Sequence, residues 1–255
     1  MLAWLGEELA RADYIVAAVN HHGNTSSESS LTAEGFMLWW ERATDLSRVV
    51  DKLLDDSQFG GLIDPSRIGA GGFSLGGYAV LAVAGARTSL AQWQKFCESP
   101  MRDSTCEAQP EFPEMFTAFE LVRQDPSVRS SLNRHNDSFR DPRIRAVFAI
   151  APVGSWHTPD SLGAIEVPVR ITVGASDRTA PAATNAQRVA DLVLGARLTV
   201  VDGVGHYTFL AECTAAGRSQ RQGLCHEEAG VDRQAAHRTV ALEAVSFFKQ
   251  IFGTR

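Results

Sequence analysis

The stretch RIGAGGFSLGG, residues 67–77, decides the expected fold of this chain. It begins as a short run of small residues, which suits a buried strand, and it passes directly into the apolar segment 78–83, which suits a helix. A strand, a tight turn and a helix are therefore predicted within very little sequence, with Ser74 at the turn.

The residues Gly72-Phe73-Ser74-Leu75-Gly76 fit the pattern G-x-S-x-G of a nucleophile elbow. In such an elbow the serine occupies a turn with strained backbone angles, and the two glycines avoid collisions with the neighbouring strand and helix. We expect the backbone amide of Leu75, at the start of the helix, to donate a hydrogen bond to a developing oxyanion. The alternative is a glycine-rich turn from strand to helix that contains an incidental serine.

A serine hydroxyl is a weak nucleophile without a base, so the elbow predicts an acid and a histidine downstream. Asp177 follows the predicted strand 169–174, and His206 follows the predicted strand 198–201. We expect Gly205 to free the backbone so that the imidazole reaches the serine. The order Ser, Asp, His is that of α/β hydrolases, with a helix N-cap or a turn as the alternative role of Asp177. The other histidines precede Asp177 or follow no strand, and they are weaker candidates.

Strands and helices alternate along the chain, which predicts an α/β domain with a mostly parallel sheet and helices on both faces. The predicted strands are 14–19, 67–72, 145–150, 167–173 and 197–201. The predicted helices are 2–12, 32–56, one that begins near residue 74, 180–194 and 232–252. Residues 88–142 mix aromatic residues, prolines and charges without a clear strand. We therefore expect a mostly helical, cap-like insertion within a single domain that spans residues 1–255.

Composition and charge exclude several classes of function. The chain has 255 residues, of which 44% are hydrophobic and 21% are charged, as in one globular domain. Its net charge of -6 provides no basic surface for nucleic acid, and no apolar run reaches the roughly 18 residues that span a membrane. The sequence contains no metal-ligand pattern, P-loop or dinucleotide fingerprint, so we expect no metal ion and no cofactor. It carries no signal for an oligomeric state.

The four cysteines form two pairs that are close in sequence, Cys97 with Cys106 and Cys213 with Cys225. Four cysteines allow three connectivities, of which this local pairing is the simplest. Each bridge would close a short polar loop and add about 2–3 kcal/mol by the loop-entropy estimate. Four free thiols in a reducing cytosol are the alternative, and the spacings are not those of a structural zinc site.

Three blocks of the chain resemble the predicted dienelactone hydrolases, a group related to platelet-activating-factor acetylhydrolase. The blocks are residues 17–25, 68–77 and 173–177. The ending, which runs from residue 205 through the second cysteine pair to the last helix, is similar as well, whereas residues 88–142 lie outside the resemblance. The resemblance implies an α/β-hydrolase fold and a catalytic triad of Ser74, Asp177 and His206.

The resemblance also bears on the compartment. Relatives with this cysteine-bearing ending are often exported, so it favours a periplasmic or secreted protein with disulfides. The first eight residues lack the basic region of a secretory signal, and their short apolar stretch ends at two glutamates, Glu7 and Glu8. A cytoplasmic location is the alternative.

One departure from the family pattern concerns the N-terminus. A hydrolase of this kind has an upstream strand whose His-Gly loop supplies a second oxyanion amide, and here the chain begins inside the helix that should follow it. We expect a truncated or misassigned start, with the strands at 14–19 and 67–72 pairing directly or leaving buried backbone groups unpaired at about 1–3 kcal/mol each. His22-Gly23 comes one strand too late to replace the loop. We expect His22 to shape the edge of the substrate pocket, with Phe73 and Tyr207 also at the pocket.

The expected activity is hydrolysis of a small carboxylic ester through an acyl-enzyme on Ser74, with lactones and thioesters as further candidate substrates. The aromatic side chains of the 88–142 insertion are expected to form an apolar acyl pocket. Two alternatives stay open. One is a catalytically impaired relic that acts as a binding protein, and the other is an amidase or peptidase on the same fold.

Overall fold

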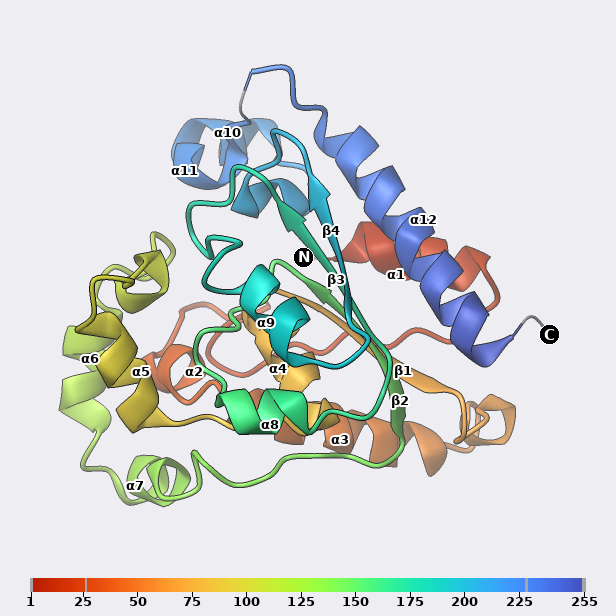
Figure 1. Cartoon of the computed structure of the whole chain (residues 1–255), viewed down its shortest axis with the longest axis horizontal. Helices are drawn as coiled ribbons and strands as arrows, with labels where there is room; N and C mark the ends of the chain where they lie inside the picture. Colours follow the sequence, from red (N-terminus) through yellow and green to blue (C-terminus); the bar gives the residue numbers. More distant parts are fainter. Residues whose placement is uncertain (1, 26, 228, 254–255) are drawn as a thin grey trace.

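The centre of the fold is a four-stranded parallel sheet (Figure 1). The computed structural model describes residues 2–25, 27–227 and 229–253. The strands are β1 (Ile68–Phe73), β2 (Ile144–Ile150), β3 (Val169–Gly174) and β4 (Arg197–Val201). Strands that follow one another in sequence are neighbours in the sheet, and every pair is parallel. The carboxyl ends of all four strands therefore meet at one end of the sheet, where the loops that follow them converge.

Helices cover both faces of the sheet, which confirms the predicted fold class. α4 (Leu75–Ala84) packs on β1 and β2, and α3 (Glu41–Leu54) packs on α4. On the opposite face, α12 (Arg233–Phe252) packs on β2 and β3, and α1 (Ala3–Arg11) lies against α12 (Figure 1). Further helices are α2 (Ala33–Met37), α8 (Pro159–Gly163), α9 (Ala186–Leu192), α10 (Ala215–Gln220) and α11 (Gln222–Cys225).

The core lies between α4, the sheet and α12. Every residue of β2 except Arg145 is buried, as the continuous apolar run of a strand in a parallel sheet predicts. Residues 77–84 of α4 are buried as well. On the other face, the ring of Phe248 packs closely on Gly69, where a Cβ atom would lie 2.5 Å from the ring. The small residues of β1 therefore let α12 approach the sheet.

Residues 14–21 are irregular, so the predicted strand at 14–19 is wrong. The side chains of Ile15 and Val16 are 45% and 42% exposed instead of buried. Among the residues that the structure describes, no strand pairs with the outer edge of β1, so residues 14–19 do not form the expected ladder with residues 67–72. An apolar run becomes a strand only where its backbone groups find such partners. Residues 14–19 and β1 instead line the same cavity.

Two predicted helices have different bounds in the structure. The helix expected over 32–56 is two helices, α2 and α3, because the chain turns between them so that Trp39 and Trp40 are both buried. Trp39 packs on Trp93 and Trp156, with ring centroids 5.5 and 4.2 Å apart. The helix expected over 180–194 is the shorter α9, which begins only after the turn that follows Pro181.

The insertion at 88–142 is helical and contains no strand, as predicted. Its helices are α5 (Leu90–Cys97), a 3-10 turn η2 (Ser104–Cys106), α6 (Met115–Val122) and α7 (Pro126–Leu132). α6 packs on α2, and Trp40 of the preceding segment donates a 2.9 Å hydrogen bond to Ser131 of α7. The insertion is therefore joined to the segment that leads into α3.

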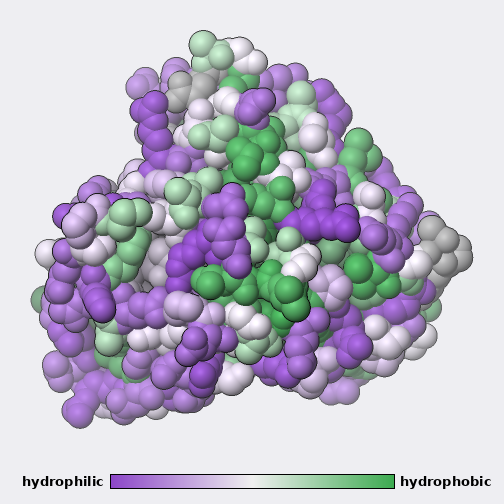
Figure 2. Space-filling model, viewed as in Figure 1, coloured by the Kyte–Doolittle hydropathy of each residue, from purple (hydrophilic) through white to green (hydrophobic). Residues whose placement is uncertain are grey.

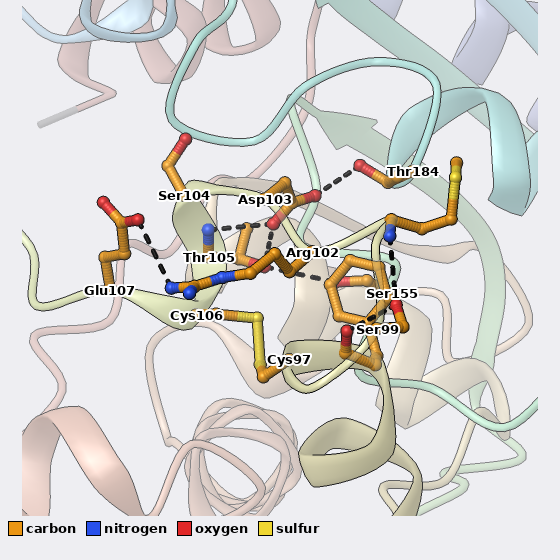
Figure 3. Close-up of a disulfide and its surroundings, with 12 residues drawn as sticks. Cys97, Ser99, Arg102, Asp103, Ser104, Thr105, Cys106, Glu107, Ser155 and Thr184 are labelled. Atoms are coloured by element: carbon orange, nitrogen blue, oxygen red, sulfur yellow. Dashed lines mark hydrogen bonds and ion pairs between the residues drawn. A yellow bond between two sulfur atoms is a disulfide. The ribbon is translucent and has the colours of Figure 1, made fainter.

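Both predicted disulfides are present, with S–S distances of 1.99 Å for Cys97–Cys106 and 1.97 Å for Cys213–Cys225. The loop closed by the first disulfide carries Asp103, whose carboxylate accepts a hydrogen bond from Thr184 (Figure 3). It accepts a second one, at 2.9 Å, from Asn185. These two residues belong to the segment that follows Asp177 in sequence. The disulfide loop of the insertion is thus docked on the loop at the end of β3.

The described ranges contain no helix that is long and apolar enough to cross a membrane. Figure 2 shows hydrophobic residues over the α9–β4 connection, β4 and α12, between polar ones. Leu194, Val200 and Leu242 are exposed there. This face of the molecule is therefore mixed in polarity.

Candidate active site

Ser74 occupies the sharp turn between β1 and α4. Its backbone angles are φ 56° and ψ -115°, a combination that is strained for a residue with a side chain. The turn is held by backbone hydrogen bonds on both sides, from the Ser74 amide to the carbonyl of Ile150 at 2.9 Å and from the Tyr78 amide to the carbonyl of Ser74 at 2.9 Å. The strand, the helix and the strained angles are those expected of a nucleophile elbow.

The two glycines that flank the elbow have different reasons to be glycine. At Gly72 a Cβ atom would lie 2.3 Å from the carbonyl oxygen of Gly76, so a side chain there would collide with the start of α4. At Gly76 a Cβ atom would have no neighbour within 4 Å, which corrects the expectation that both positions exclude a side chain. The second close approach is instead at Gly77, where a Cβ atom would lie 2.8 Å from the Cα of Pro152.

The structure brings Ser74, Asp177 and His206 together at the carboxyl end of the sheet. His206 Nε2 lies 2.9 Å from Ser74 Oγ, and His206 Nδ1 lies 2.7 Å from Asp177 Oδ2. His206 and Asp177 are 4% and 7% exposed, so water competes little for these hydrogen bonds. The three side chains form one continuous chain of hydrogen bonds from carboxylate to hydroxyl.

Asp177 has a second role in its own turn. Its Oδ1 atom accepts hydrogen bonds from the backbone amides of Thr179 at 3.0 Å and Ala180 at 2.7 Å. The alternative interpretation of this residue, a turn aspartate, therefore describes one oxygen, while the other oxygen faces His206. The turn fixes the carboxylate in the orientation that the imidazole requires.

His206 begins a 3-10 turn, η3 (His206–Phe209), that follows β4. The loop before it crosses the end of β3 closely, since a Cβ atom at Gly174 would lie 2.1 Å from the carbonyl oxygen of Val204. Gly205 has φ -91° and ψ 175°, angles that any residue adopts. The glycine that lets His206 reach Ser74 is therefore Gly174, and the expectation for Gly205 is corrected.

Leu75 is the first residue of α4, and the amide of a first helical residue has no acceptor within the helix.

His22 does not lie at the pocket edge, which corrects the sequence expectation. Its side chain is 85% exposed and pairs with Glu28 at 2.8 Å. The cavity is lined at this place by the neighbouring His21, whose Nδ1 lies 2.8 Å from Asp45.

A cavity of about 1130 Å³ opens beside Ser74 and His206. Phe73 and Tyr207 line it, and it continues along β1 toward α1 and α3. The apolar lining of the cavity comes mainly from outside the insertion. It includes Phe36, Phe73, Leu75, Met115, Val153 and Trp156.

The insertion contributes only one of these apolar residues, Met115, together with the polar side chains of Thr105, Gln109 and Glu111. This corrects the expectation that its aromatic residues form the acyl pocket. Those residues are used in packing instead, as where the ring of Phe112 lies 5.4 Å from that of Phe36. The sequence identified an aromatic segment but not which of its surfaces faces the core.

Tyr207 links the insertion to the loop that carries His206. Its hydroxyl donates a 3.1 Å hydrogen bond to Glu111, and its ring lies 5.2 Å from the imidazole of His206. Burial raises the pKa of Tyr207 far above its ordinary value, and the nearby Glu111 carboxylate raises it further. The phenol therefore stays protonated, and it acts as a hydrogen-bond donor at this edge of the cavity. No motif or spacing in the sequence points to Glu111.

Comparisons with known proteins match part of this chain to hydrolases. The Prolyl oligopeptidase family matches residues 3–92, a segment that contains Ser74 but neither Asp177 nor His206. Lipase 1 from Moraxella sp. (strain TA144) is 29% identical over 89 residues, which are 35% of this chain. They are also 24% of the lipase, so the chain spans about a quarter of that relative's length.

Among solved structures, a predicted CIB-like hydrolase from Thermoplasma acidophilum matches 80% of this chain and 60% of its own chain. The identity is 14% and the TM-score is 0.36. The parallel sheet, its helices and the family match together place the chain in the α/β-hydrolase fold. The matched proteins include a prolyl oligopeptidase family and a lipase, so the matches do not decide between peptide and ester substrates.

Proposed function

We propose that this protein hydrolyses carboxylic esters through an acyl-enzyme on Ser74, with His206 as the general base and Asp177 as its orienting acid. The observation that carries the proposal is the chain of hydrogen bonds from Asp177 through His206 to Ser74, with distances of 2.7 and 2.9 Å. It supports acyl transfer because a serine hydroxyl becomes a nucleophile when a positioned base removes its proton.

In the proposed mechanism, His206 takes the proton of Ser74 as the oxygen attacks the ester carbonyl carbon. The amide of Leu75 donates a hydrogen bond to the oxyanion that forms. Asp177 holds the imidazole in the required tautomer and stabilises the imidazolium. His206 then gives the proton to the leaving alcohol, and in the second half it activates the water that cleaves the acyl-enzyme.

Two further observations favour an ester as the substrate. The cavity beside Ser74 is lined mainly by apolar side chains, including Phe36, Met115 and Trp156, which suit an acyl chain. The stretch shared with the lipase and the resemblance to the dienelactone hydrolases both support cleavage of an ester or lactone. A second candidate, a peptidase, is favoured by the match of residues 3–92 to the Prolyl oligopeptidase family.

The test is turnover of p-nitrophenyl butyrate by the purified protein beside Ser74→Ala, with Ser130→Ala as the matched control. Ser130 is exposed on α7, so its loss should leave the rate unchanged. A proline-containing p-nitroanilide, assayed in parallel, measures amide cleavage. We expect ester turnover that requires Ser74 and little amide turnover, and faster amide than ester turnover would favour the peptidase.

Labelling with a fluorophosphonate probe separates both enzymes from a binding protein. The probe should attach to the wild-type chain and to Ser130→Ala but not to Ser74→Ala, because only an activated serine reacts. Failure of Ser74 to react, in protein that is folded by circular dichroism, would contradict the proposal and favour a binding protein.

A further inference from the structure

The segment that begins at Asp177 is held by the loop that the first disulfide closes. We call residues 177–185 the acid loop and residues 97–106 the disulfide loop. At the start of the acid loop, the hydroxyl of Ser104 donates a hydrogen bond to the backbone carbonyl of Arg178. The disulfide loop is therefore attached one residue away from Asp177.

The disulfide loop makes its second contact through Asp103, at the far end of the acid loop (Figure 3). The Oδ2 atom of Asp103 accepts hydrogen bonds from the hydroxyl of Thr184 and, at 2.9 Å, from the side-chain amide of Asn185. Its Oδ1 atom accepts the backbone amide and the hydroxyl of Thr105. All four partners donate, which suits an ionised carboxylate because it can only accept. Asp103 thus joins its own turn to the acid loop.

Hydrogen bonds inside the acid loop connect Asp103 to Asp177. The side-chain amide of Asn185 donates to the backbone carbonyl of Pro181 at 3.1 Å as well as to Asp103. Pro181 follows Ala180, whose amide donates to Asp177 Oδ1 at 2.7 Å. A short, continuous path therefore runs from the Asp103 carboxylate to the Asp177 carboxylate.

The side chain of Asn185 joins loops instead of capping a helix. Asn185 occupies the N-cap position of α9, where an asparagine ordinarily accepts a helix amide, yet no amide of the described helix donates to it. Its Oδ1 atom accepts the amides of Gly154 and Ser155 in the loop after β2, at 3.1 and 3.2 Å. Asp103 favours this orientation, because it binds Nδ2 and leaves Oδ1 to the two amides. The loops after β2 and β3 are thus tied together at a fully buried side chain.

We propose that Asp103 is a positioning residue that acts through the acid loop to keep Asp177 against His206. The role rests on the proposed ester hydrolysis at Ser74. Asp177 Oδ2 lies 2.7 Å from His206 Nδ1, and this contact sets the imidazole tautomer that the reaction needs. A displacement of about 1 Å can reduce the rate by about 100-fold. The disulfide limits the conformations of the loop around Asp103, so the carboxylate is held ready for the acid loop.

The kinetic test is Asp103→Asn, assayed with p-nitrophenyl butyrate. An asparagine carries one oxygen and one amide group, so at least one of the four donors would face another donor. We expect kcat to fall about 10- to 100-fold and KM to change less than about threefold. Asp125→Asn is the matched control, because Asp125 is exposed in the same insertion and its side chain makes no capping bond within the described helix α7. Wild-type kcat in Asp103→Asn would overturn the proposal.

A double-mutant cycle distinguishes positioning from a general loss of structure. In the Asp177→Asn background, Asp103→Asn should lower kcat by less than about threefold, because the carboxylate that it positions is already gone. A purely structural role would reduce kcat by the same factor in both backgrounds, and that result would overturn the proposal.

Thr184→Val and Thr184→Ser form a matched pair that leaves Asp103 in place. Valine keeps the shape of the side chain but removes the hydroxyl that Asp103 accepts, whereas serine retains this hydroxyl. We expect Thr184→Ser to keep kcat within about twofold of the wild type and Thr184→Val to lose about 3- to 10-fold, the range of one hydrogen bond. Equal kcat values in the two variants would overturn the proposal. This pair also decides the question if Asp103→Asn does not fold.

Proton NMR separates this inference from the proposed function, because it observes Asp177 and His206 without a substrate. The His206 Nδ1 proton, hydrogen-bonded to a carboxylate, should resonate far downfield of the backbone amides and disappear in Asp177→Asn. Asp103→Asn should shift or broaden this resonance, and Asp125→Asn should leave it unchanged. Ester turnover that requires Ser74, with a resonance that ignores Asp103→Asn, would retain the hydrolase and reject the positioning role. A resonance that depends on Asp103, without ester turnover, would retain the positioning of Asp177 and reject the ester hydrolase.

Discussion

The carboxyl end of the sheet and the outer edge of β1 differ in how completely their groups are paired. At the carboxyl end, His206 is hydrogen-bonded through both ring nitrogens and Asp177 through both oxygens. At the outer edge of β1 no described strand continues the ladder, and Ile15 and Val16 across the cavity are exposed. The first region is built from residues that directly follow strands. The second region would need a further strand, from another part of the sequence, to pair with β1. Local sequence therefore determines the first region and not the second.

The largest expected effect is on turnover at the carboxyl end of the sheet. Ser74→Ala should reduce kcat by about 10⁴-fold or more, because it removes the nucleophile. The melting temperature should stay within about 2 °C of the wild type, since the strained turn is held by backbone hydrogen bonds. Ester turnover and thermal unfolding measure the two quantities, and wild-type activity in the variant would show that the hydrogen-bonded chain is not the catalytic one.

Asp177→Asn should reduce kcat by about 10³- to 10⁴-fold, because an amide facing Nδ1 favours the wrong imidazole tautomer. The fold should be retained, since an asparagine oxygen can still accept the amides of Thr179 and Ala180. Asp202→Asn, at an exposed position in the loop before His206, is the control. A loss of stability as large as the loss of activity would mean that Asp177 serves its turn more than the imidazole.

Matched isoleucines compare the two regions directly. Ile171 in β3 is fully buried and Ile15 is 45% exposed. Ile171→Ala should lower the free energy of unfolding by about 2–5 kcal/mol, and Ile15→Ala by about 0.5 kcal/mol or less. Urea denaturation measures both. Equal losses would show that residues 14–19 are as well packed as a central strand.

The same contrast explains how far the sequence could be interpreted. The elbow, the acid and the histidine were placed by the rule that functional residues follow parallel strands, and the structure brings those three side chains together. The strand expected at 14–19 rests on apolar composition alone, which carries no information on whether a backbone partner is present. The same limit applies to the aromatic residues of the insertion, since Phe112 faces Phe36 and not the acyl pocket.

Asp103 shows a different limit. An aspartate in a polar loop resembles any turn residue in sequence, and only the fold reveals that it contacts the loop that carries Asp177. The correction from Gly205 to Gly174 has a similar cause. Gly174 is required because the loop before His206 crosses it, and such a contact between separate loops leaves no mark in the local sequence.

The elbow glycines provide a smaller effect with an internal control. Gly72→Ala places a Cβ atom 2.3 Å from the Gly76 carbonyl, and it should lower the free energy of unfolding by about 1–3 kcal/mol. Gly76→Ala meets nothing within 4 Å and should be neutral or stabilising by up to about 1 kcal/mol, because alanine favours a helix. Denaturation of both variants tests the assignment. A destabilisation of equal size would show that both glycines are needed to form the turn.

A pH dependence of stability is also expected, because the loop after β2 carries the fully buried His157. Burial lowers the pKa of His157 to about 3, from an ordinary value of 6.5. The unfolded chain therefore takes up this proton first as the pH falls below 6.5, and stability is lost progressively down to about pH 3. Between pH 7 and pH 5 the loss from this group is roughly 2 kcal/mol. His157→Gln should flatten that part of the urea-denaturation profile, and an unchanged slope would mean that another group causes the acid sensitivity.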